Sequence, residues 1–244
     1  MKLVVDAHTH TISSGHAYST VQENAREAVN KGIEMFVVTD HGPSLEGAPS
    51  LLHFANLKAI PDEIYGVRVA KGVEANIIDY SGNLDVPAEY LRRLDFVIAS
   101  LHDICIKPAT IEQHTNALIK VLENPYVDAV AHPGNPVFQV DIEKVVKAAA
   151  ENMKLIEINN HSFDVRKGCE ENCEEFARIC CKMGVRMICS SDAHISFEVG
   201  SFDRIQRLFD KVKVPESLVL CTSVEKFEEY ILQKKRRLNL KRGN

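Results

Sequence analysis

A regular alternation between short apolar runs and helical patterns constrains the fold of this chain more than any other feature of its sequence. Seven such runs each end in polar residues, the pattern of buried strands. They are Leu3–Val5, Met35–Val38, Val67–Ala70, Phe96–Ala99, Val127–Ala131, Leu155–Ile158 and Arg186–Cys189. Because strands that alternate with helices form a parallel sheet, we predict an α/β protein.

The segments between these runs carry helix start and stop signals. Ser19 with Gln22 and Thr110 with Gln113 have the spacing of capping boxes. Two more helical patterns, 201–212 and 222–237, follow the seventh strand, and the short run 218–220 between them could be an eighth strand.

The count of seven strands and the expectation of a single core favour one closed barrel over an open doubly wound sheet. The 244 residues are 45% hydrophobic and 26% charged, within the range in which α/β barrels form one domain. The sequence has no repeat or linker, so we predict a single domain over residues 1–244. The phosphate-binding patterns GxGxxG and GxxxxGK[ST] are missing, which argues against a nucleotide-binding fold.

The net charge and the hydropathy of the sequence limit the classes of partner that we expect. A net charge of -5 lacks the basic footprint of a duplex-binding protein, so long nucleic acid is not the default partner. The apolar run before Asp6 is too short for a signal peptide, and no stretch approaches the roughly 20 apolar residues of a membrane span. We expect a soluble cytoplasmic protein without a membrane partner. The basic end, KKRRLNLKR, is expected to be a solvated helix terminus.

The seven cysteines are odd in number and unevenly placed, which indicates reduced and mostly buried thiols. Cys169 and Cys173 could form half of a zinc site. No second pair has finger spacing, so packing is the preferred interpretation.

Metal-ligating residue types follow nearly every predicted strand. They are His8, His10, His41, Glu74, His102, His132, Asp192 and His194. Because the carboxyl ends of barrel strands converge on one mouth, these residues are expected to meet there. Residues two apart on an extended chain point to the same side, so HTH and DAH can each present a ligand pair. Imidazole with carboxylate favours zinc, with manganese or iron as alternatives.

Other polar residues near these strand ends have open roles. Asp40 and Asp103 could orient ligand imidazoles or protonate a leaving group. His53 could gate the mouth or bind substrate, although a partly buried helix residue is preferred. His114 and His161 are expected to be structural histidines.

The strings HTH, TDHG, GVEAN, AHPG and SDAH resemble those of the PHP (polymerase and histidinol phosphatase) superfamily. SSGHAYST, TDHGPSLEGAP, HPGNP and RKGCEENC are similar to its YcdX-like phosphatase branch over nearly the whole chain. The resemblance implies a distorted (β/α)7 barrel, TIM-barrel-like, with three zinc ions per chain.

The resemblance also implies how the ligands divide, and adds His16 to them. One metal would take His8, His10, Glu74 and Asp192. A second would take Glu74, His102 and His132, so that Glu74 bridges the two. The third would take His16, His41 and His194. Glu74 and Asp192 would then be the catalytic carboxylates. All nine ligands are present, which argues against an inactive relative.

The activity so implied is hydrolysis of phosphate esters, above all phosphomonoesters, with a hydroxide between two metals as nucleophile. The partner would be a small phosphorylated substrate. Arg166 is expected to bind its phosphate in preference to Lys167, because the planar guanidinium meets phosphate in a bidentate way. A nuclease or phosphodiesterase acting on nucleotides or single-stranded DNA remains an alternative, as does a non-catalytic metal-binding regulatory protein. The natural substrate and the oligomeric state, a homo-oligomer included, stay open.

Overall fold

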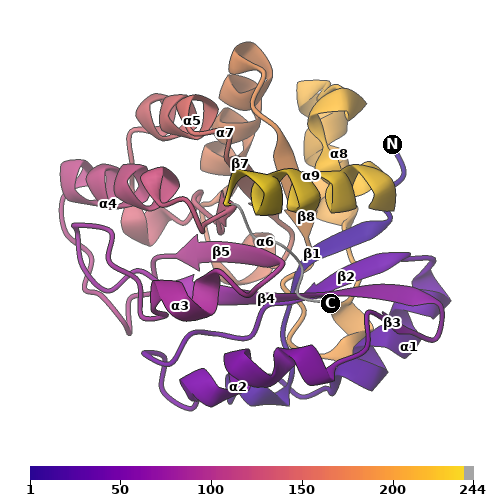
Figure 1. The fold of residues 1–244 in the computed structure, drawn as a ribbon. Helices are drawn as coiled ribbons and strands as arrows, with labels where there is room; N and C mark the ends of the chain where they lie inside the picture. The colour runs from indigo at the N-terminus through magenta and orange to yellow at the C-terminus, as the bar shows by residue number, and fades with distance from the viewer. Residues whose placement is uncertain (239–244) are drawn as a thin grey trace.

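The computed structural model describes residues 1–238, in which a nearly closed barrel of parallel strands lies inside a layer of helices (Figure 1). Neighbouring strands of the barrel pair in the order β1 (Val5–Thr9), β2 (Met35–Val38), β4 (Val67–Asn76), β5 (Phe96–Ser100), β6 (Ala129–Val130), β7 (Leu155–Asn159) and β8 (Met187–Ser190). This order confirms the predicted distorted (β/α)7 barrel.

Helices cover the outside of the barrel, and both faces of its strands are therefore buried. The α-helices are α1 (Val21–Lys31), α2 (Leu51–Asn56), α3 (Ala88–Leu91), α4 (Ile111–Glu123), α5 (Ile142–Glu151), α6 (Ser162–Val165), α7 (Glu170–Met183), α8 (Asp203–Val212) and α9 (Val224–Arg237). None of the described helices combines the length and apolarity that a bilayer crossing needs.

One further strand, β3 (Glu63–Ile64), pairs antiparallel with β4 and lies off the barrel. Tyr65 and Gly66 between them have φ values of 53° and 82°. Two positive φ values are what a two-residue hairpin turn of type I′ requires. The sequence patterns did not predict this short hairpin.

The barrel closes between β8 and β1. At the carboxyl end of the strands, the amide of Asp192 donates to the carbonyl of His8 over 3.0 Å. At the other end, Val219 bridges Met187, and the amide of Val4 donates to the carbonyl of Cys221. The open possibility of an eighth strand at 218–220 is therefore wrong, because this segment forms two 3-10 turns, Glu216–Leu218 and Leu220–Thr222, around a single bridging residue.

Hydrogen bonds at the helix N-termini confirm one predicted capping box and show that the other lies one residue further along the chain. Thr110 and Gln113 form the predicted capping box of α4. In α1 the box is made by Thr20 and Glu23, one residue later than predicted. The Ser19 hydroxyl instead accepts a hydrogen bond from the amide of Ser196, so it is not free to cap the helix.

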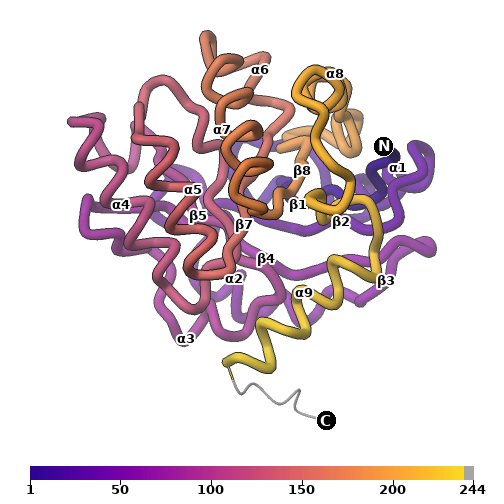
Figure 2. The backbone as a smooth tube through the Cα atoms, turned by 90° about the horizontal axis from the view of Figure 1, so that it is seen from above, coloured from indigo at the N-terminus to yellow at the C-terminus, as the bar shows by residue number. Residues whose placement is uncertain are grey.

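Helix α9 crosses the end of the barrel at which the strands begin (Figure 2). Phe227 and Tyr230 pack on Phe96, and their ring centroids lie 5.0 and 6.2 Å from the centroid of the Phe96 ring. Lys234 is buried and pairs with Asp128. Lys235 likewise pairs with Asp95. The prediction of a solvated basic terminus is wrong for these two lysines, and residues 239–242 of the basic stretch lie outside the described residues.

The cysteines are free thiols, and five of them are buried: Cys169, Cys173, Cys180, Cys189 and Cys221. Cys169 donates through Sγ to the carbonyl of Ser162, and Cys173 packs in the core. The pair is thus part of the packing between α6 and α7.

Candidate metal centre

A cavity of about 650 Å³ opens at the carboxyl ends of the barrel strands. Seven of the nine predicted ligands line it: His16, His41, Glu74, His102, His132, Asp192 and His194. His8 and His10 are fully buried and contact these residues. The structure therefore brings all nine predicted ligand residues to the mouth of the barrel.

The HTH segment faces two carboxylates across the barrel. The Nε2 atoms of His8 and His10 lie 2.9 Å apart. Asp192 Oδ1 is 3.0 Å from His10 Nε2 and 3.4 Å from His8 Nε2. Glu74 Oε2 is 3.3 Å from His8 Nε2 and 3.5 Å from His10 Nε2.

Glu74, on β4, lies at the centre of the cluster. Its Oε1 atom is 2.9 Å from His132 Nε2 and 3.3 Å from His102 Nε2. Its Oε2 atom is 2.7 Å from His41 Nδ1. One carboxylate thus contacts imidazoles from four loops or strand ends, as a bridging ligand would.

The remaining pair lies at the outer side of the cavity, where His194 Nε2 and His16 Nε2 are 3.0 Å apart. In three combinations the donor atoms all lie within 4.8 Å of one another: His8, His10 and Glu74; His41, Glu74 and His102; His10, His41 and His194. The first lacks the Asp192 that the family resemblance implies. In the other two, His41 stands in for His132 and His10 for His16.

Hydrogen bonds behind the imidazoles fix which ring nitrogen of His8 and of His10 carries a proton. His8 Nδ1 lies 2.8 Å from Glu157 Oε1, which can only accept. His10 Nδ1 lies 3.0 Å from Ser14 Oγ, whose own proton goes to Asp40 Oδ1. Both Nδ1 atoms therefore donate, and both Nε2 atoms present a lone pair to the cluster.

Three further histidines also donate through Nδ1. His16 and His194 donate through Nδ1 to the carbonyls of Ser14 and Asp192, over 3.1 and 2.9 Å. His102 Nδ1 lies 2.7 Å from the side-chain oxygen of Asn76. The Asn76 amide nitrogen donates to Gly42 O, so its oxygen is the acceptor. Each of these Nε2 atoms is therefore also a free electron-pair donor.

This donor set fits a metal ion. The Nε2 atoms face each other about 3 Å apart in two histidine pairs, so each pair needs a cation, either a proton or a metal ion, between its lone pairs. His41 Nδ1 and Glu74 Oε2 are buried, and although they lie 2.7 Å apart they form no hydrogen bond with each other or with any other described group. Buried polar groups without partners are unfavourable, and a cation among them would satisfy them. Imidazole nitrogens oriented from behind by acceptors are typical of zinc ligands.

Burial and neighbouring cationic groups lower the pKa of two imidazoles of the cluster. Burial, together with His41, holds the pKa of His10 well below its usual range. Burial and Arg166 lower the pKa of His132 to about 4. These imidazoles are therefore neutral, as metal ligands must be.

The carboxylates attract positive charge to the same place. Burial opposes ionisation of Glu74 and Asp192, but the surrounding histidines outweigh it and hold the pKa of each well below its usual range. At His8, burial is outweighed by Asp192, Glu74 and Glu157, which raise its pKa. The ring of carboxylates thus favours a cation beside His8, whether a proton or a metal.

Two predicted ligands have a strained backbone. His132 and Asp192 have φ values of 32° and 56°, in the left-handed region that favours glycine. Strain of this kind is typical of functional sites and persists only where surrounding contacts enforce it. Here the His132 amide donates to Glu157 Oε2, and the Asp192 amide donates to the His8 carbonyl.

Asp40 is buried and surrounded by hydrogen-bond donors, including Thr11, Ser14 and His53. Although burial raises it, the hydrogen bonds, that of His53 foremost, lower the pKa of Asp40 to about 2. An ionised Asp40 that holds Ser14 against His10 supports the orienting role. Asp103 is exposed at the rim of the cavity.

The histidines outside the predicted ligand set differ in position. His53 is a partly buried residue of α2, as preferred from the sequence. His114 is buried and bridges the Ala109 amide and the Gln139 carbonyl, a structural role. His161 lines the cavity, where its ring stacks on that of His194 with centroids 5.6 Å apart.

Arg166 also lines the cavity, from the end of α6. Its Nη1 atom donates to Ser162 Oγ over 3.0 Å and lies 3.7 Å from Asp192 Oδ2. The guanidinium group is therefore held at the cluster, whereas the neighbouring Lys167 is exposed.

Sequence reasoning missed Glu157, which is buried on β7 beneath the cluster. The signal was present in LIEIN, since an acidic residue inside an otherwise apolar strand needs buried partners. Glu157 and Asn159 are two apart and therefore lie on the same face of β7.

Known proteins similar to this chain share its sequence over nearly its full length. A probable phosphatase of Acetivibrio thermocellus is 68% identical over 241 residues, which cover 99% of this chain and 100% of the relative. A probable phosphatase of Thermoanaerobacter sp. is 54% identical over 240 residues, covering 98% of each.

Solved structures with the same fold are more distant in sequence. One is the histidinol phosphate phosphatase of Lactococcus lactis, solved with zinc, L-histidinol and phosphate, at a TM-score of 0.63 and 19% identity over 86% of this chain and 94% of that one. A chain in the structure of archaeal ribonuclease P with mature tRNA has a TM-score of 0.59 and 13% identity, covering 96% of this chain and 93% of that one. The PHP domain model matches residues 6–168, and the chain belongs to the PHP domain family.

Proposed function

We propose that this protein is a metal-dependent phosphatase that hydrolyses small phosphomonoesters. The observation that carries the proposal is the cluster of imidazole lone pairs around Glu74 and Asp192 at the mouth of the barrel. The names of the two relatives described above, both probable phosphatases, support the same reaction class.

The proposed metal content is three zinc ions, with manganese or iron as alternatives. The first would be held by His8, His10, Glu74 and Asp192, the second by Glu74, His102 and His132, and the third by His16, His41 and His194. Support comes from the contacts of Glu74 with His102 and His132, from the approach of His16 to His194, and from the zinc in the related fold of the histidinol phosphate phosphatase.

Bound at these positions, zinc supplies the Lewis acidity that makes a water nucleophilic near neutral pH and offsets charge on phosphoryl oxygens. The chain's own residues supply the rest. Glu74 and Asp192 are ionised and fixed in place by the histidines around them. Arg166 can bind phosphate oxygens through its guanidinium fork, which orients the ester toward the cluster.

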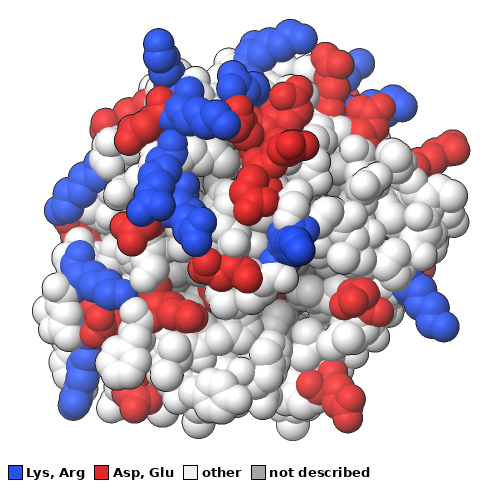
Figure 3. Space-filling model, turned by 180° about the vertical axis from the view of Figure 1, so that it is seen from behind, with Lys and Arg blue, Asp and Glu red and all other residues white. Residues whose placement is uncertain are grey.

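The shape and charge of the mouth favour a small monoester over a polynucleotide. Besides the predicted ligands, the cavity is lined by Arg166, by the two carboxylates Glu46 and Asp103, and by apolar residues that include Ile104 and Val165. On the face opposite that of Figure 1, the described Lys and Arg residues lie mostly at the upper left and are interspersed with Asp and Glu (Figure 3). A strand of nucleic acid is normally bound along a positively charged groove.

We also propose that residues 1–244 form one domain. A single cluster of buried hydrophobic residues extends from Leu3 in front of β1 to Ile231 on α9. A domain boundary would interrupt such a core.

The test is a comparison of substrates under identical conditions. Zinc- or manganese-loaded protein is assayed with p-nitrophenyl phosphate, bis(p-nitrophenyl) phosphate and a short single-stranded DNA, with Asp192→Ala as the negative control. We expect kcat/KM for the monoester to exceed that for the diester by orders of magnitude and to vanish in Asp192→Ala. Preferential cleavage of the diester or the DNA would instead support the nuclease alternative.

A further inference from the structure

Glu157 connects two parts of the cluster that are far apart in sequence. Its Oε1 atom accepts from His8 Nδ1 over 2.8 Å and from Ser190 Oγ over 2.6 Å. Its Oε2 atom accepts from the backbone amide of His132 over 2.5 Å and from Asn159 Nδ2 over 3.3 Å. Four donors therefore converge on one buried carboxylate.

We propose that Glu157 is a positioning residue that selects the tautomer of His8 and fixes the backbone of His132. The inference rests on the proposed function, in which His8 and His132 bind different metal ions. One side chain would then set the position of a ligand for each ion.

The chemistry of the four donors makes a carboxylate necessary. Each oxygen of Glu157 must accept, and only a carboxylate accepts at both ends. A glutamine would have to place its NH₂ group either against His8 and Ser190 or against His132 and Asn159.

These two orientations are not equivalent. The backbone amide of His132 can only donate, so its partner at position 157 must be an oxygen. The Ser190 hydroxyl can rotate, and His8 can move its proton from Nδ1 to Nε2. The glutamine would therefore turn its NH₂ group toward His8.

The consequence for His8 is specific. With its proton on Nε2, the nitrogen that faces Glu74 and Asp192 would no longer carry a lone pair and could not bind a metal. His10 would keep its tautomer, because Ser14 and Asp40 hold its Nδ1 proton independently of Glu157. His10 is therefore an internal control for the tautomer of His8.

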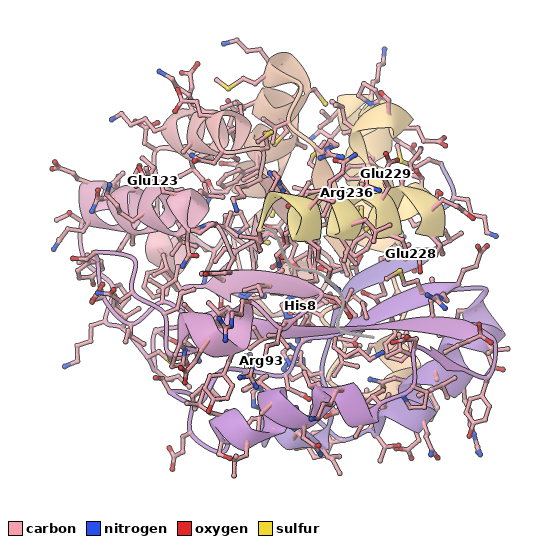
Figure 4. All side chains as sticks on the ribbon, in the orientation of Figure 1. His8, Arg93, Glu123, Glu228, Glu229 and Arg236 are labelled. Carbon is pink, nitrogen blue, oxygen red and sulfur yellow. The ribbon has the colours of Figure 1, made fainter. Side chains whose placement is uncertain are left out.

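The experiment measures which ring nitrogen of His8 carries the proton. Zinc-loaded wild type and Glu157→Gln, both labelled with ¹⁵N-histidine, are compared by long-range ¹H–¹⁵N correlation, and zinc affinity is measured by chelator competition. Glu123→Gln is the matched control, since Glu123 lies on the outer surface of α4, far from His8 inside the barrel (Figure 4).

We expect Nδ1–H at His8 in the wild type and in Glu123→Gln, but Nε2–H in Glu157→Gln, with His10 unchanged in all three. Zinc affinity of Glu157→Gln should fall about 10- to 100-fold, the usual effect of losing a group that orients a ligand. A merely structural role of Glu157 would lower stability without moving the proton.

Three results would overturn the proposal. A proton on His8 Nε2 in the wild type does so even if Glu157→Gln fails to fold. Retention of Nδ1–H and of wild-type zinc affinity in Glu157→Gln removes the role of Glu157 while leaving the proposed function intact. A wild-type protein that binds no zinc at His8 would overturn the metal-dependent function and this inference together.

Discussion

Arg166 is the one Lys or Arg among the described residues that line the cavity. If its guanidinium binds the substrate phosphate, Arg166→Ala should retain its metal but lose a charge-assisted hydrogen bond of about 1.5–3 kcal/mol. We therefore expect kcat/KM for a phosphomonoester to fall roughly ten- to a hundredfold. Arg166→Lys should recover part of this loss, because a point charge replaces a planar fork.

The neighbouring Lys167 provides the control, since it is exposed and lies outside the cavity lining. Lys167→Ala should have wild-type kcat/KM and metal content. Equal activity of Arg166→Ala and wild type would mean that phosphate recognition belongs to the metal cluster alone.

The sequence identified site residues where a metal-ligating residue type lies near the end of a predicted strand. His8 and Asp192 could be found because each comes three residues after the end of an apolar run, and the ends of barrel strands converge whatever the details of packing. Glu157 could not be assigned a role in this way. Its partners His8 and His132 are 149 and 25 residues away, and a single buried acid does not reveal which distant donors it meets.

At the scale of elements, the apolar runs located the barrel strands but not their ends. The first run was predicted to stop at Val5, yet β1 continues through Thr9. Polar Asp6 and His8 are fully buried in the barrel, where hydrogen bonds and the cluster satisfy them. A hydropathy pattern ends at the first polar residue, whereas the strand does not. The short hairpin of β3 gave no periodic signal at all.

Helix α9 contributes a buried ion pair at the base of the barrel, between Lys234 and Asp128. Lys234→Met should destabilise the protein by about 3–5 kcal/mol, because it leaves Asp128 as a buried charge without its partner. The second substitution Asp128→Asn should restore part of that stability. Denaturant unfolding monitored by circular dichroism measures both effects.

Arg236, on the same helix but exposed, is the matched control (Figure 4). Arg236→Met should change the free energy of unfolding by no more than about 0.5 kcal/mol. The account of α9 is contradicted if Lys234→Met is as stable as Arg236→Met.

The two ends of the barrel have different roles in the whole molecule. The base is closed by α9 and its ion pairs with Asp95 and Asp128, which stabilise the fold. The mouth gathers ionisable groups that stability alone does not require, and two of its residues, His132 and Asp192, have a strained backbone. This separation is usual for barrels whose loops at the carboxyl end carry the chemistry.

The central claim is that the cluster at the mouth is a metal centre required for phosphomonoester hydrolysis. The most direct measurement is a zinc titration of chelator-stripped protein, followed by phosphate release from a monoester. We predict no turnover in the stripped protein, recovery that saturates near three equivalents of zinc per chain, and no recovery in His10→Ala. Full turnover of stripped protein, or wild-type activity of His10→Ala, would contradict the claim.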